Sequence, residues 1–102
     1  MKIFKELKKL GYIHYSATTI EELDDLPLNS AERISEQALV LRWFREKYDL
    51  HGKVGIYHFI ENTYCYSIVS KNAPHYIHKE SQFETYEEAE LECLKKLISI
   101  VK

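Results

Sequence analysis

Glycine and proline are scarce in this chain, with three and two residues respectively among 102. So few of either leave little room for long flexible linkers. The glycines stand at positions 11, 52 and 55, which is too scattered for a glycine-rich phosphate-binding loop. No apolar run approaches the ~20 residues that a membrane-spanning helix needs. These absences favour one globular domain over residues 1–102 and argue against a membrane partner.

Cysteine and net basic charge are also in short supply. The two cysteines, Cys65 and Cys93, lack the paired spacing of a zinc site. Residues 1–10 are lysine-rich and amphipathic, without the continuous apolar stretch of a signal peptide. We therefore expect free thiols and a cytoplasmic location. The formal net charge of −2 gives no bulk basicity that would favour nucleic acid or an anionic membrane.

The first 28 residues predict two short helices. Residues 2–10 carry apolar side chains at helical spacing, and Gly11 follows as a suitable left-handed cap. A second helix of about two turns begins after Thr19, which has capping-box spacing to Glu22. Pro27 makes a longer helix unlikely to continue through that point. We call residues 1–28 the N-terminal arm.

Residues 31–49 predict the central helix, capped by Asn29 or Ser30. At 100° per residue, one side of this helix carries five apolar residues: Ile34, Ala38, Leu41, Phe44 and Tyr48. Leu39 and Trp43 fall on nearly the opposite side. A helix with apolar residues on both sides is usually buried on both. We expect the sheet to cover the first side, and the N-terminal arm or a second subunit to cover Leu39 and Trp43.

Two aromatic and β-branched segments, residues 53–60 and 63–70, predict a β-hairpin. A three-residue loop, Ile60 to Asn62, requires only Asn62 in the left-handed region, whereas a two-residue loop would place Glu61 there as well. We therefore expect the three-residue loop. In that register one face, expected to pack on helices, carries Ile56, His58, Tyr64, Tyr66 and Ile68. The other carries Gly55, Tyr57, Phe59, Cys65, Ser67 and Val69.

The remaining residues predict a weak third strand, within residues 75–79 or 82–83, and a final helix. Thr85 and Glu88 form a capping box ahead of a broad apolar stripe that extends to Val101. The predicted fold class is therefore α+β. The N-terminal arm packs on an α-β-β-β-α core, residues 29–102, with a small antiparallel sheet and helices on one face.

This order of elements resembles the topology of double-stranded-RNA-binding domains. Those domains contact RNA phosphates through a lysine-rich start to their final helix. Here the corresponding segment is "TYEEAE", in which Glu87, Glu88 and Glu90 would face an anion, and Lys95 and Lys96 come too late along the helix. We therefore carry no RNA contact onto any residue.

A second resemblance is more local. The segments "ALVLRWFREKYDL", "YCYSIV" and "FETYEEAELECLKKLISIVK" look like a set of small uncharacterised proteins of gut Bacteroidales and their phages. The resemblance covers residues 38–102. It implies a small α/β domain and a phage or mobile-element setting, and it supplies no catalytic residue.

The candidate chemistry is sparse. His75 and His78 have the best metal-like spacing, but residues three apart on a strand point to opposite faces. His58 could add a third ligand, or could activate Cys65, yet nothing basic lies near that thiol in the sequence. Adjacent glutamates such as Glu87 and Glu88 diverge on a helix. We therefore assign no catalytic, cofactor-binding or metal-binding residue.

The aromatic residues are the most informative group, because they make up 13% of the chain and include eight tyrosines. A phenol offers a large contact area and a polar tip, which suits protein interfaces. The expected interaction surface comprises Tyr57, Phe59, Tyr64, Tyr66, Tyr76 and Trp43; sheet propensity and core filling are the plainer explanation of the same residues. The expected function is a small non-enzymatic interaction module, a phage or mobile-element accessory protein that binds a protein partner or itself.

Two other classes of function stay open. Nucleic-acid binding would use the sheet face or the lysines of residues 2–9. A small enzyme would use His58, His75 and His78, and would contain bound metal.

Overall fold

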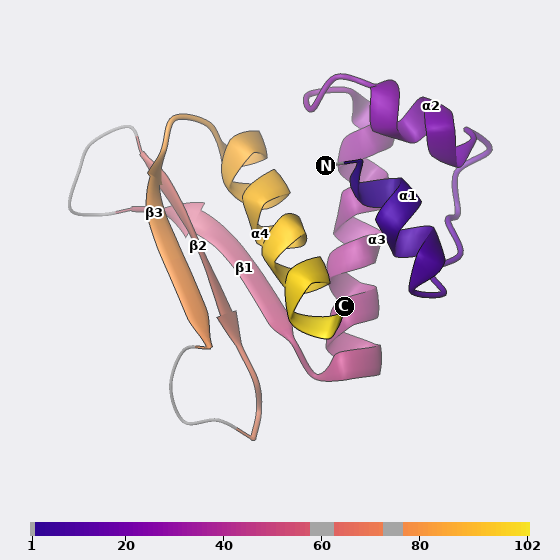
Figure 1. Ribbon diagram of the computed structural model, residues 1–102. Helices are drawn as coiled ribbons and strands as arrows, with labels where there is room; N and C mark the ends of the chain where they lie inside the picture. The colour runs from indigo at the N-terminus through magenta and orange to yellow at the C-terminus, as the bar shows by residue number, and fades with distance from the viewer. Residues whose placement is uncertain (1, 58–62, 73–76) are drawn as a thin grey trace.

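The computed structural model describes residues 2–57, 63–72 and 77–102, and it has the predicted α+β fold (Figure 1). Two short helices, α1 (Ile3–Lys9) and α2 (Ile20–Asp25), form the N-terminal arm. The core follows as α3 (Ala31–Tyr48), β1 (His51–Ile56), β2 (Tyr64–Val69), β3 (His78–Phe83) and α4 (Tyr86–Val101). The predicted weak third strand is a single strand of six residues, which overlaps the predicted segment 75–79 and includes the segment 82–83.

Side-chain caps start three of the helices. The hydroxyl groups of Thr19, Ser30 and Thr85 accept hydrogen bonds from the backbone N–H groups three residues later, at Glu22, Arg33 and Glu88. Each bond satisfies one of the N–H groups that a helix start leaves unpaired. Gly11 has φ 98°, in the left-handed region, where the chain leaves α1. The predicted starts of α2 and α4 are confirmed, and Ser30 rather than Asn29 caps α3.

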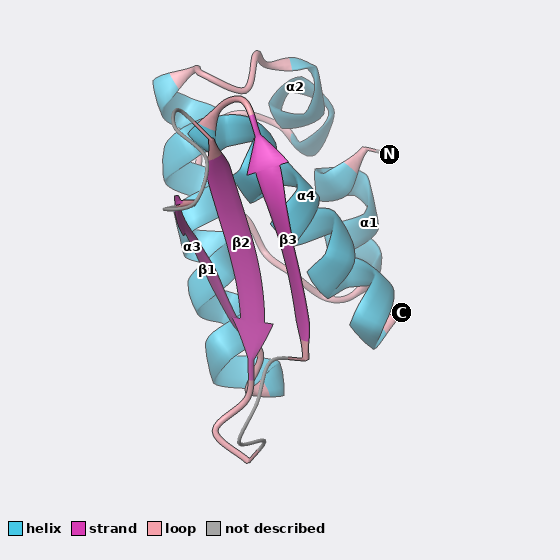
Figure 2. Ribbon diagram, turned by 90° about the vertical axis from the view of Figure 1, so that its left-hand side faces the viewer, coloured by secondary structure: helices cyan, strands magenta, loops and turns pink. Residues whose placement is uncertain are grey.

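The three strands form an antiparallel sheet in the order β1-β2-β3. Both α3 and α4 pack against it from one side, and Figure 2 shows the strands in front with the helices behind them. Tyr66 and Ile68 of β2 are buried under these helices, as expected for the face that carries them. The opposite face of the sheet carries no helix of the described chain.

The predicted register of the hairpin is wrong by two residues. A loop over residues 60–62 would place Ile56 opposite Tyr66, whereas the structure places Ile56 opposite Tyr64. The loop itself lies outside the described residues. A shift of two residues preserves the alternation of a strand, and for that reason the predicted division of residues between the two faces is still correct.

The buried side of α3 also differs from the prediction. It is formed by Arg33, Glu36, Gln37, Val40 and Phe44, three of which are polar. The predicted core residues at the start of the stripe are instead exposed, since Ile34 is 38% accessible and Ala38 is also open to solvent. The prediction considered apolar residues alone. Polar residues can also be buried when their hydrogen bonds are satisfied, and three such residues lie on the buried side of α3.

The N-terminal arm docks on α3 and α4, on the side of the helices away from the sheet (Figure 1). Its apolar residues Ile3, Phe4, Leu7 and Leu23 are fully buried. Tyr12 meets Trp43 edge to face, with ring centroids 5.4 Å apart, so the arm covers Trp43 within the same chain.

Candidate interaction surface

The predicted aromatic surface is not one surface in the described residues. Tyr66 is only 2% exposed, and its hydroxyl donates a hydrogen bond to Glu80 Oε2 at 2.7 Å. Tyr64 shares that helix-packed face and lies edge to face with Tyr86 of α4, centroids 6.2 Å apart. Tyr66 is therefore a core residue, because the helices cover its ring and Glu80 satisfies its hydroxyl.

Trp43 belongs to a different cluster, at the junction of the arm and α3. Its ring makes edge contacts with Tyr12, Phe44 and Tyr48, at centroid distances between 5.1 and 5.5 Å. Lys47 Nζ lies 5.1 Å from its ring centroid, within the range of a cation–π interaction. Trp43 therefore stabilises the intramolecular contact between arm and core, and it does not join the tyrosines of the sheet.

Of the other predicted surface residues, Phe59 and Tyr76 lie outside the described residues. Tyr57 directly follows β1 and is half-buried. Its backbone N–H donates to the carbonyl of Thr63 at 3.0 Å, which extends the β1–β2 pairing by one residue.

The uncovered face of the sheet is polar and basic at its centre. Lys53, Ser67 and Lys79 occupy one row across the three strands, because Ser67 is opposite Lys53 on one side and Lys79 on the other. Side chains of neighbouring rows include His51, Cys65 and Val69. The sequence predicted Cys65, Ser67 and Val69 on this face. Its two lysines lie at the ends of the predicted segments 53–60 and 75–79 and were not assigned to a face.

A shallow cleft between β3 and α4 is lined by acidic, basic and hydroxyl side chains. The lining residues are Tyr66, His78, Glu80, Glu92, Lys95, Lys96 and Ser99. His78 Nε2 lies 3.6 Å from Glu80 Oε1. Burial, and then the hydrogen bond to Glu80, raise the pKa of the Tyr66 phenol, which stays protonated and is a poor base. Ser99 donates to a backbone carbonyl of its own helix, so the cleft does not present an activated nucleophile.

The cysteines and histidines do not assemble a reactive centre in the described part of the chain. Cys93 is fully buried, and burial raises the pKa of its thiol to about 12. Such a thiol is inert at neutral pH. Within the described ranges no three histidine, cysteine or acidic side chains are close enough to hold a metal ion. His58 and His75, the predicted partners of Cys65 and His78, lie outside those ranges.

Buried charged residues hold the N-terminal arm to the core. Arg33 is 6% exposed and donates from Nη1 to the carbonyls of Leu23, Asp24 and Leu26, which end α2. Its Nε donates to Gln37 Oε1 at 2.9 Å. The bonds to Asp24 and Leu26 satisfy carbonyl groups that the end of α2 would otherwise leave unpaired, and the carbonyl of Leu23 also accepts from the N–H of Leu26.

Glu36 has the same role one turn further along α3. Its carboxylate accepts hydrogen bonds from the hydroxyl of Tyr12 and from the backbone N–H groups of Tyr15 and Ser16, at 3.0 and 2.9 Å for the two N–H groups. The carboxylate of Asp24 accepts from the N–H groups of Phe4 and Lys5 at the start of α1. These carboxylates are therefore committed to the fold and are not free for catalysis.

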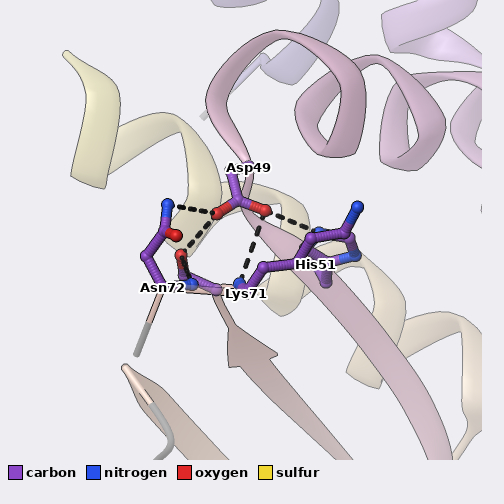
Figure 3. A network of polar contacts seen from close by, with 5 residues as sticks. Asp49, His51, Lys71 and Asn72 are labelled. Atoms are coloured by element: carbon purple, nitrogen blue, oxygen red, sulfur yellow. Dashed lines mark hydrogen bonds and ion pairs between the residues drawn. The ribbon is translucent and has the colours of Figure 1, made fainter. Parts of the chain in front are cut away.

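Asp49 connects the end of α3 to the turn after β2 (Figure 3). It has φ 53° and ψ 36°, the left-handed conformation that closes α3. Its carboxylate accepts hydrogen bonds from Ser70 Oγ at 2.7 Å, Asn72 Nδ2 at 3.3 Å and the N–H of Lys71 at 3.4 Å. His51 Nε2 lies 2.9 Å from Oδ1 of this carboxylate, the oxygen that also accepts from Lys71. The hydrogen bond from Ser70, followed by that from His51, lowers the pKa of Asp49.

Acidification is expected to remove the stabilisation that Asp49 provides. Because the folded-state pKa is lowered, this stabilisation is present above the ordinary aspartate pKa of about 3.9 and is lost as the pH falls through the folded value. Asp49→Asn keeps the left-handed backbone that asparagine tolerates but removes the charge. Urea unfolding should find the variant less stable than the wild type at pH 7, with the difference shrinking below about pH 4. A difference that is constant with pH would contradict this role.

The acidic start of α4 is preserved in the structure. Glu87 and Glu88 lie in its first turn after the Thr85 cap. The lysines of both ends of the chain meet elsewhere, at Glu6, which contacts Lys9 Nζ at 3.6 Å and Lys102 Nζ at 3.2 Å. Lys102 follows the last turn of α4, at the opposite end of the helix from Glu87 and Glu88. The acidic helix start is therefore not converted into a basic surface.

Comparison of the chain with protein-family models, with curated proteins and with solved structures finds no match. None of the helices in the described ranges combines the length and the apolar character needed to cross a membrane.

Proposed function

We propose that this protein is a small non-enzymatic interaction module that binds a protein partner or a second copy of itself. The observation that carries the proposal is the one-sided sheet: α3 and α4 pack on one face, and no described helix covers the other (Figure 2). In the described residues no further strand pairs with the outer edges of β1 and β3, so a sheet face and two strand edges offer surface for a further chain.

The use of the polar side chains supports a non-enzymatic role. Arg33 and Glu36 make hydrogen bonds that join the arm to the core, and Asp49 makes hydrogen bonds to the turn after β2. The cleft between β3 and α4, which has both acidic and basic side chains, contains the Tyr66 phenol, whose raised pKa keeps it protonated and unavailable as a general base. Elemental analysis of the purified protein should find no stoichiometric metal; bound metal would favour the histidine-based enzyme instead.

The phage or mobile-element setting is the part of the proposal that rests on the sequence resemblance of residues 38–102. In that setting the protein is an accessory factor that acts by binding.

Nucleic-acid binding is the second candidate, favoured by the α-β-β-β-α order and by the row of Lys53 and Lys79 on the open face. Against it, Glu87 and Glu88 occupy the helix start where phosphate contact would be expected, and Glu6 neutralises lysines near both chain ends.

Gel-shift titration at low salt, with single- and double-stranded DNA and RNA, separates the two candidates. The expected result is no shift at micromolar protein. Tight binding that weakens steeply with salt would overturn the protein-interaction proposal. A Lys53→Glu and Lys79→Glu double variant then decides whether the open face is responsible, with Lys71→Glu, an exposed residue outside the strands, as the matched control.

A further inference from the structure

The two edges of the sheet differ in how well they are protected. The β3 edge has an irregular register with β2, a left-handed residue at Gln82 (φ 72°), and adjacent charges at Lys79 and Glu80. Bulges and charges are the usual means by which edge strands avoid pairing with other chains. The β1 edge, His51 to Ile56, pairs with β2 without interruption and contains no proline and a single lysine. It is the edge open to a further strand.

The backbone of β1 is oriented for such a strand. The N–H of Tyr57 donates to Thr63, its direct opposite in β2. In an antiparallel pair, residues that exchange hydrogen bonds alternate with residues that do not. The backbone groups of Lys53 and Gly55 are therefore directed toward β2, and those of Gly52 and Val54 away from it. At the end of the strand the carbonyl of Ile56 lies 3.9 Å from Cys65 Sγ of β2.

Apolar side chains lie uncovered along the same edge. Ile56 is on the helix-packed face of the sheet but is 63% exposed. On α3, Leu41 packs over Gly52, since a methyl group added to Gly52 would lie 3.1 Å from Leu41 Cδ2. Val54 is on the same face as Ile56 and is half-buried. Leu41, Val54 and Ile56 thus form a short apolar strip at the β1 edge that the monomer leaves partly open.

The sequence of β1 is complementary to itself when two copies run antiparallel. With the two-fold axis at Val54, the two Val54 residues face each other and Gly52 of one copy faces Ile56 of the other. Lys53 then faces Gly55. Ile56 and Lys53 each meet a glycine, the two valines meet each other, and the two lysines are not opposed. An axis at Lys53 would instead place like charges directly opposite, which is destabilising.

We propose that two copies of the chain pair through β1 in this register, which joins two three-stranded sheets into one and covers the apolar strip. This inference rests on the interaction-module proposal and names the partner as a second copy. Another protein at the same edge would need no such self-complementarity.

Size-exclusion chromatography with light scattering, over a range of protein concentrations, tests the pairing. The wild type is expected at twice its 12.1 kDa mass. Val54→Pro removes an N–H that is not used in the β1–β2 ladder, and it should give a monomer. Ile56→Lys, at an exposed site, should raise the dissociation constant about tenfold or more, and it gives an answer even if the proline variant fails to fold.

The matched control is Ile77→Lys, which changes an isoleucine that is 43% exposed and lies outside β1. It should leave the dimer intact, and circular dichroism should show that the lysine variants remain folded. A wild type that is monomeric at all concentrations, or a dimer that Ile56→Lys leaves unchanged, overturns the β1 pairing. Neither result tests the broader proposal of a non-enzymatic interaction module. That proposal is tested by the nucleic-acid titration and by the metal analysis.

Discussion

Glu36→Ala is expected to lower the free energy of unfolding by about 3 kcal/mol, because it leaves several donors unpaired at a buried site. The carboxylate is 2% exposed and serves the Tyr12 hydroxyl and the N–H groups of Tyr15 and Ser16. Alanine removes the carboxylate oxygens that accept these hydrogen bonds, and water has little access to the site to replace them. Urea unfolding followed by circular dichroism measures the loss.

Glu32→Ala is the matched control for this prediction. Glu32 is on the same helix, one turn earlier, but it is exposed and accepts a single side-chain hydrogen bond, from Thr18. Its replacement should change the stability by no more than about 0.5 kcal/mol. Glu36→Gln should recover little, since an amide offers one acceptor oxygen where three donors converge and adds an NH₂ group that faces N–H groups. Equal losses for Glu36→Ala and Glu32→Ala would show that the arm is held by its apolar contacts alone.

The parts of the fold that depend on neighbouring residues were predictable from the sequence. Thr19 and Thr85 cap their helices through bonds to residues only three positions away. The division of strand residues between two faces follows from the alternation of side chains, which is a property of the strand itself. Each of these features could be predicted because all the groups involved lie within one short segment.

Features that depend on distant partners could not be predicted. Glu36 is 24 residues from Tyr12, and Gln37, which donates to Glu90 at 2.7 Å, is 53 residues from its partner. An apolar pattern assigns polar residues such as Glu36 and Gln37 to the surface. For this reason the predicted core face of α3 included Ile34, which is exposed in the structure. Glu90 is 5% exposed, and desolvation raises its pKa, so this carboxyl does not belong to the exposed acidic helix start that the sequence predicts.

Tyr66 was assigned to the interaction surface in error for a related reason. A tyrosine in a strand can lie in the core or on the surface, and the outcome depends on whether its hydroxyl finds a partner. Tyr66 finds Glu80 on the adjacent strand, 14 residues away, and is buried. The open face carries Lys53, Ser67 and Lys79 from the three strands, and these residues are accessible because no helix of the described residues covers that side of the sheet.

Gly52→Ala is expected to cost about 2 kcal/mol, because the helices pack directly on the β1 backbone at this point. An added methyl group would lie 2.8 Å from Cys93 Sγ, 3.1 Å from Leu41 Cδ2 and 3.2 Å from Leu97 Cδ1. Gly55, three residues later in the same strand, has no such neighbour within 4 Å, so Gly55→Ala should change the stability by less than about 0.5 kcal/mol. Urea unfolding of the two alanine variants therefore separates packing from the intrinsic preference of a strand for alanine over glycine.

Removing the thiol that obstructs the new methyl group should restore part of the loss. Cys93→Ala leaves space above Gly52, at the cost of a small cavity when introduced alone. The double variant Gly52→Ala, Cys93→Ala should therefore be more stable than the sum of the single changes predicts, by about 1 kcal/mol. Additive effects would show that the clash is relieved by movement of the strand, and that close contact between α4 and the β1 backbone does not require glycine at this position.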